Sequence, residues 1–163
     1  VSYVQVGSAY GVAAGNPKNF DPTDPCGKTI GVQTGTAQED YATELSEQCV
    51  ADGKDKITIM PHDLQTDIAT KVIGGQYDAT FADSTVIGYT TNLSGGKIEQ
   101  VGDVVDSAPQ GVAINKNDEQ LTQAVQKAMQ YLMDNGYLTD ILAKYGAENA
   151  ALTTAELNPA TND

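Results

Sequence analysis

Two short segments of the sequence carry residue types suited to gripping a free amino acid. They are residues 31–39 (GVQTGTAQE) and residues 77–84 (YDATFADS). A free amino acid carries a carboxylate and an ammonium on one carbon, so a site for it needs hydrogen-bond donors beside a fixed negative charge. The first segment offers backbone donors at a helix start and the second offers the Asp83 carboxylate, so the two together predict half of such a clamp.

The first segment contains a helix-start pattern, because Thr36 and Glu39 match the S/T-x-x-E capping box. A predicted strand and a tight turn precede it, so the donors lie at the carboxyl end of a strand, where open α/β sheets bind ligands. A ligand carboxylate there accepts from the N–H groups of Ala37 and Gln38 and from the Thr36 hydroxyl, and Gly35 lets it approach closely. The alternative is a helix cap with no ligand.

Asp83 ends an apolar segment and precedes Ser84, so two roles are open for its side chain. It caps the following helix or it pairs with a ligand ammonium, and a carboxylate has enough acceptor positions for both. Gln33, beside the turn, either reaches a ligand side chain or is only a solvated polar residue. Glu39 and Asp40 repel a bound anion unless they turn outward.

The two cysteines, Cys26 and Cys49, stand before a predicted strand and at the end of the helix after it. This arrangement can bring them together, and a disulfide there would stabilise the fold by about 3 kcal/mol and indicate an oxidising compartment. Two free cysteines in a cytosolic protein are the alternative. One histidine and two separated cysteines match no metal-ligand spacing, so we expect neither a metal nor a cofactor.

Composition narrows the function classes. The 163 residues, 40% of them apolar, suffice for one ordinary domain or two small lobes. A net charge of −13 with only nine basic residues argues against nucleic acid as a partner. No apolar run is long enough to span a membrane and no signal peptide is recognisable, so we expect a soluble chain whose export signal has been removed.

The order of apolar runs and helical stripes predicts an α/β domain with a largely parallel sheet. Strands are expected at residues 29–33, 57–60, 77–82 and 98–101, and helices at residues 37–49, 64–73 and 84–93. Two longer strands, residues 3–14 and 110–115, flank this block as a pair of crossover strands.

Residues 119–146 form two strongly amphipathic helices for which the chain supplies no covering sheet. Without a sheet these helices would expose an apolar stripe. We therefore expect that the chain comes from proteolysis of a longer protein, pairs with a retained fragment, or forms a swapped oligomer. Residues 147–163 are rich in Thr, Asn and Ala and are expected to form a flexible tail.

Four motifs carry a family resemblance: CGKTIGVQTGTAQE (26–39), GQYDATFADS (75–84), GGK (95–97) and QGVAINK (110–116). Their order resembles that of the polar amino-acid solute-binding proteins of ABC importers, family 3, over residues 1–146. The two cysteines, with Cys26 just before Gly-Lys, make the chain resemble the lipid-anchored members of the Gram-positive, actinobacterial branch of this family. The resemblance implies an extracellular, cell-surface or periplasmic location.

The resemblance also implies a type II periplasmic-binding-protein fold, also called a Venus flytrap, present as one complete lobe plus the C-terminal part of the other. The implied division is a crossover strand from lobe 1 (1–10), lobe 2 (11–108), the returning strand and helices of lobe 1 (109–146) and the tail (147–163). The hinge strands lie near residues 6–14 and 107–114. Most of lobe 1, with an arginine that clamps the ligand carboxylate, is missing from the N-terminal side.

For the site, the resemblance implies carboxylate contacts at Thr36 and Ala37, an ammonium contact at Asp83, and side-chain selection partly by Gln33 and Gln38. The expected function is capture of a polar amino acid for delivery to a permease, without enzymatic activity. One alternative is an enzyme on this fold, such as a dehydratase or a lobe of a cell-wall lytic enzyme, although no residue pair here suits catalysis. Another is the effector domain of a cytosolic regulator, against which the expected disulfide and the lack of a DNA-binding segment argue.

Overall fold

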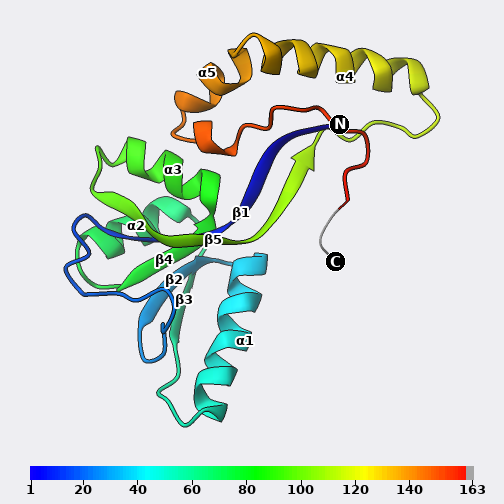
Figure 1. The fold of residues 1–163 in the computed structure, drawn as a ribbon. Coiled ribbons are helices and arrows are strands. Elements are labelled where there is room, and N and C mark those ends of the chain that lie inside the picture. The colour runs from blue at the N-terminus through cyan, green and yellow to red at the C-terminus, as the bar shows by residue number, and fades with distance from the viewer. Residues whose placement is uncertain (161–163) are drawn as a thin grey trace. The chain divides into compact units, whose positions relative to one another are not determined.

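The computed structural model describes residues 1–160, in which strands and helices alternate from β2 to β5 (Figure 1). The chain divides into a larger unit, Ser8–Val105, and a smaller unit made of Val1–Gly7 and Asp106–Asp163. The strands are β1 (Ser2–Ala13), β2 (Thr29–Gln33), β3 (Thr58–His62), β4 (Ala79–Asp83) and β5 (Ile98–Gly111). The helices are α1 (Ala37–Ala51), α2 (Gln65–Ile73), α3 (Ser84–Leu93), α4 (Glu119–Asp134), α5 (Tyr137–Ala143) and a 3₁₀ turn, Glu148–Ala150.

The sheet has the strand order β3-β2-β4-β1-β5. Strand β2 runs parallel to both of its neighbours, β3 and β4, whereas β1 pairs with β4 in the antiparallel direction. Each of β2, β3 and β4 leads directly into a helix, so α1, α2 and α3 all begin at the same edge of the sheet. The mixed α/β fold with a parallel centre is thereby confirmed.

The side chains of β2 alternate between two cores, as a strand covered on both faces requires. Ile30 and Val32 are fully buried and lie in the core cluster that includes residues of α1. Gly31 faces α2, and a Cβ atom at this position would lie 2.3 Å from the Ile68 Cγ2 atom. Only glycine therefore lets α2 pack this closely on the sheet.

A disulfide links Cys26 to Cys49 and joins the loop before β2 to the last turn of α1. Cys49 is almost completely buried in the core of the larger unit. The expected pairing is confirmed and the alternative of two free cysteines is wrong.

One sequence-based expectation about the strands is wrong. Separate strands at residues 98–101 and 110–115 were predicted, but the structure has one continuous strand, β5, that ends at Gly111. Gly102 and Asp106 adopt positive φ and Pro109 has no N–H, so the stretch looks interrupted in the sequence. Because β5 is the edge strand of the sheet, it tolerates such residues.

In the smaller unit, the C-terminal segment lies along the start of β1. Ala151 forms an antiparallel bridge with Val4, and the Leu152 N–H donates to the Tyr3 carbonyl oxygen at 3.1 Å. Ala150 is buried with Val4 in a small apolar cluster. Residues 150–156 therefore make defined contacts with β1, within the stretch for which the sequence predicts a flexible tail. Residues 161–163 of the expected tail lie outside the described residues.

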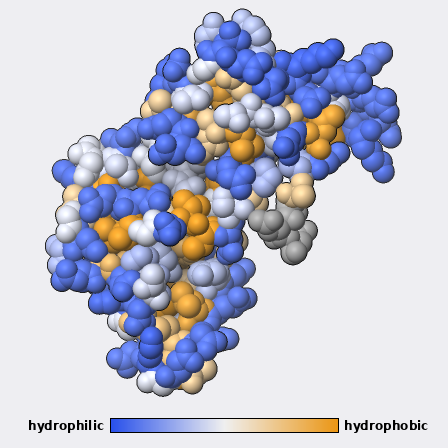
Figure 2. Space-filling model, in the orientation of Figure 1, coloured by the Kyte–Doolittle hydropathy of each residue, from blue (hydrophilic) through white to orange (hydrophobic). Residues whose placement is uncertain are grey.

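Helix α4 has no buried residue, although its sequence is strongly amphipathic. Gln126 and Gln130 donate hydrogen bonds to carbonyl groups of the C-terminal segment along one side of the helix. Leu121 remains 48% exposed and Tyr131 58% exposed. The predicted exposed stripe is present, and Figure 2 shows apolar residues reaching the surface of both units.

None of the described helices is both long enough and apolar enough to cross a bilayer. Nor do residues 1–160 place three His, Cys, Asp or Glu side chains where they could hold a metal ion.

Tyr10 is a core residue that stacks on Phe81 with ring centroids 4.4 Å apart. Burial, and secondarily the nearby Tyr41 phenol, raise the pKa of Tyr10 to about 12. The unfolded tyrosine ionises near pH 10, so the neutral phenol stabilises the fold fully below about pH 10. This contribution is lost as the pH rises from about 10 through about 12.

We expect Tyr10→Phe to lose less unfolding free energy than the wild type when the pH is raised from about 9 to about 11, because phenylalanine cannot ionise. Urea unfolding at the two pH values measures this difference. Tyr137→Phe, at a tyrosine that is 49% exposed, should keep the wild-type pH dependence. An identical loss in the wild type and in Tyr10→Phe would contradict the assignment.

Candidate functional site

The candidate site lies in the larger unit, where β2 passes into α1. Gln33 ends the strand, Gly35 turns the chain with φ of 74°, and Thr36 is the N-cap of the helix in extended conformation. Glycine suits this turn because other residues adopt positive φ only at a cost. A Cβ atom added at Gly35 would meet nothing within 4 Å, so the space above the helix start is open.

The predicted capping box is present in a modified form. The Glu39 carboxylate accepts a hydrogen bond from the Gly35 N–H at 2.7 Å, one residue before the N-cap. The Thr36 hydroxyl donates to the Gln33 carbonyl oxygen at 2.7 Å and accepts from the Glu39 N–H at a long 3.4 Å. Glu39 therefore turns back onto the turn, and the Thr36 hydroxyl hydrogen is engaged within the protein.

The first N–H groups of a helix have no acceptor inside that helix. Those of Ala37 and Gln38 are such donors at the start of α1, and Ala37 is exposed. The helix dipole adds a partial positive charge at this end, so an anion is favoured there. They are the two N–H groups for which the sequence predicts a contact with a ligand carboxylate.

The Gln38 side chain connects the helix start to Asp83. Its Nε2 atom donates to Asp83 Oδ1 at 2.8 Å and to Ser8 Oγ at 2.8 Å. Asp83 precedes α3, but its side chain makes no capping hydrogen bond to that helix in the structure as described. Asp83 is therefore the N-cap residue of α3 by position, and its carboxylate accepts a hydrogen bond from a side chain at the start of α1.

Gln33 lies at the margin of this site. Its side chain is exposed and its Nε2 atom donates to the Asp63 carbonyl oxygen at 3.1 Å. The structure thus gathers Gly35, Thr36, Ala37 and Gln38 in one turn beside Asp83, with Gln33 turned toward the loop after β3. The disulfided Cys49, in the last turn of α1, lies at the opposite end of that helix.

Sequence reasoning missed Ser8. It stands directly opposite Asp83 in the antiparallel pairing of β1 with β4. No local motif marks this serine, because its relation to Asp83 depends on a pairing between strands that are far apart in the chain.

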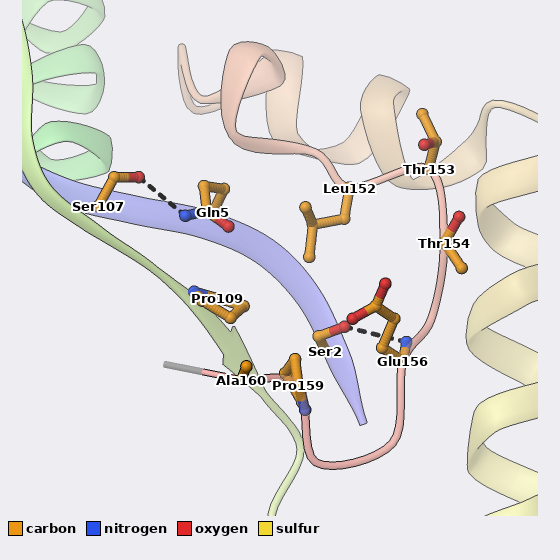
Figure 3. A pocket seen from close by; sticks show the side chains of 10 residues that line it. All are labelled: Ser2, Gln5, Ser107, Pro109, Leu152, Thr153, Thr154, Glu156, Pro159 and Ala160. Carbon is orange, nitrogen blue, oxygen red and sulfur yellow. Dashed lines mark hydrogen bonds between the residues drawn. The ribbon is translucent and has the colours of Figure 1, made fainter. Parts of the chain in front are cut away.

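A separate hollow of about 350 Å³ lies in the smaller unit (Figure 3). Gln5 Nε2 donates to Ser107 Oγ there at 3.0 Å, and the Glu156 N–H donates to Ser2 Oγ at 3.0 Å. These polar groups satisfy one another, and none of the predicted site residues lines this hollow.

Solved structures share this fold. The second substrate-binding domain of a putative amino acid ABC transporter from Streptococcus pneumoniae has a TM-score of 0.67 and 24% identity, covering 90% of this chain and 63% of that one. A polar amino acid ABC uptake transporter substrate-binding protein from Streptococcus thermophilus has a TM-score of 0.72 and 19% identity, covering 93% and 57%. At these identities the likeness shows the fold alone.

A curated relative is closer in sequence. The arginine-binding protein ArgT of Corynebacterium glutamicum is 36% identical over 159 residues, which are 97% of this chain and 52% of ArgT. The chain is thus similar in sequence to one part of ArgT, and it shares its fold with substrate-binding proteins of amino acid ABC transporters. The chain spans about half the length of the curated relative it matches. No protein-family model matches it.

We expect Glu39→Gln to lower the unfolding free energy of the protein by about 1 kcal/mol, because the charge-assisted bond to the Gly35 N–H and the favourable dipole interaction are lost. Denaturant unfolding measures the change. Glu47→Gln, an exposed position on the same helix, is the matched control and should change stability little. Equal effects at both positions would show that the Glu39 contact contributes nothing.

Proposed function

We propose that this chain is the amino-acid-gripping part of an extracellular or periplasmic protein that captures a polar amino acid and delivers it to the permease of an ABC importer. Arginine is the first candidate cargo, because the curated relative is named an arginine-binding protein. In this proposal the protein is not an enzyme, and the longer protein is lipid-anchored at the cell surface.

One observation carries the proposal: Gln38, whose backbone N–H is one of the two donors at the start of α1, also donates from its side-chain Nε2 atom to Asp83 Oδ1 at 2.8 Å. The donors and the carboxylate are therefore only one side chain apart. The ligand carboxylate accepts from the N–H groups of Ala37 and Gln38, and its ammonium pairs with Asp83. Each charge-assisted bond contributes about 1.5 to 3 kcal/mol. The open space above Gly35 admits the carboxylate.

Two further predicted contacts require side chains to move. Thr36 reaches the ligand carboxylate only after its hydroxyl turns away from the Gln33 carbonyl oxygen, where it now donates. Gln33 reaches the ligand side chain only after its amide leaves the Asp63 carbonyl oxygen. Both present bonds involve exposed groups, for which water can substitute at small cost.

In the proposed protein, residues 11–108 form lobe 2, while residues 1–10 and 109–146 belong to lobe 1. The lobes close about the crossover strands when the ligand binds. We propose that residues outside this chain complete lobe 1 and cover the exposed apolar side chains of α4 and α5. The coverage of only 52% of the curated relative supports this part of the proposal.

Calorimetric titration with arginine, and then with the other amino acids, tests the function in the longest natural form of the protein. Asp83→Asn should weaken binding by 2 kcal/mol or more, because the ammonium loses its counter-charge. Asp103→Asn, at an exposed position of β5, is the matched control and should bind like the wild type. We expect this chain alone to bind weakly or not at all. The function is wrong if the longest form binds no amino acid.

We also expect this chain, when studied alone, to self-associate through α4 and α5 in light scattering. Tyr131→Lys should reduce the association, because Tyr131 is 58% exposed on α4. Val50→Lys, equally exposed at 58% on α1, should not. A monodisperse wild-type chain whose α4 amides resist hydrogen exchange would contradict the need for a cover.

A further inference from the structure

The amide group of Gln38 is fully committed as a donor. An amide nitrogen carries two hydrogens, and both of those on Gln38 are used, one on Ser8 Oγ and one on Asp83 Oδ1, each at 2.8 Å. The side chain is not free to rearrange, because Gln38 is only 9% exposed. To donate to a ligand, this amide would have to break one of two partly buried hydrogen bonds, and the one to Asp83 involves a charged group.

The Asp83 carboxylate accepts one of these two hydrogen bonds through its Oδ1 atom. It is half-buried at the end of β4, and among the described residues it makes no capping bond to α3 that would fix it. The bond from Gln38 is charge-assisted and therefore strong. Its other anchor, Ser8, stands opposite Asp83 in the strand pairing, so the amide spans two neighbouring strands from a third element, α1.

We propose that Gln38 is a positioning residue, which holds the Asp83 carboxylate for a ligand ammonium and is itself anchored on Ser8. The proposal rests on the proposed function and replaces the direct role in ligand selection that the resemblance implies for the Gln38 side chain. A carboxylate fixed before binding loses less conformational freedom when the ligand arrives, which raises affinity. Asp83 keeps acceptor positions for the ammonium, because a carboxylate accepts about four hydrogen bonds.

The test is a double-mutant cycle between Gln38→Met and Asp83→Ala, read out first by unfolding in the absence of ligand. Methionine keeps a similar length and removes both donors. The stability losses of the two single variants should sum to more than the loss of the double variant, because both remove the same bond. Strictly additive losses would overturn the proposal, since Gln38 would then not act on Asp83.

The second readout is arginine affinity in the longest natural form of the protein. Gln38→Met should weaken binding about tenfold, or about 1.4 kcal/mol, and should have no further effect in the Asp83→Ala background. Ser8→Ala should weaken binding by a smaller factor and leaves both partners in place, so it remains informative if Gln38→Met folds poorly. Gln48→Met, which removes an exposed amide bond to Asp52 on the same helix, is the matched control and should bind normally.

The two readouts separate this proposal from the proposed function. An equal loss from Gln38→Met with and without the Asp83 side chain would overturn the positioning role, because the Gln38 side chain would then act on the ligand and not through Asp83. If the wild type binds none of the amino acids, the proposed function fails and the positioning role fails with it. The ligand-free cycle would still show whether the hydrogen-bond link exists.

Discussion

The parallel pairing of β2 with β3 and β4 is the constraint on which the candidate site depends. It brings the carboxyl ends of three strands to one edge of the sheet, with Ile30 opposite Ala79 and Val32 opposite Phe81. Burial of these side chains on the sheet holds the register, because a shift by one residue would turn them to the wrong face. The start of α1 and the Asp83 carboxylate become neighbours as a consequence, although they are far apart in the chain.

The candidate site has a positive end and a negative end, and the residues gathered there include no basic side chain. Backbone N–H groups of Ala37 and Gln38 supply the positive end, and the Asp83 carboxylate supplies the negative one. Glu39 would repel an anion at the helix start, but its carboxylate is held back on the Gly35 N–H. In a chain with a net charge of −13, these backbone dipoles place a partial positive charge at the candidate site.

The smaller unit shows the opposite condition, an amphipathic element without enough to cover it. Asp118 caps helix α4 and Gln126 donates a hydrogen bond from its side to the C-terminal segment, but the helix has no buried residue. The C-terminal segment packs against β1 and pairs with backbone groups near Val4. This pairing does not bury the apolar side of α4. Local sequence thus builds the helix, while the contacts within residues 1–160 leave its Leu121 48% exposed and its Tyr131 58% exposed.

The sequence by itself determined the α/β class, the bounds of α3, the turn at Gly35 and the helix start at Thr36, because period, capping and glycine conformation are local properties. It indicated the Cys26–Cys49 pairing but left free thiols open. Only the tertiary structure decided that β5 is one strand, that the C-terminal segment packs on β1, and that Gln38 joins Ser8 to Asp83. Each of these depends on contacts between distant segments, and local propensity carries no information about which distant groups will meet.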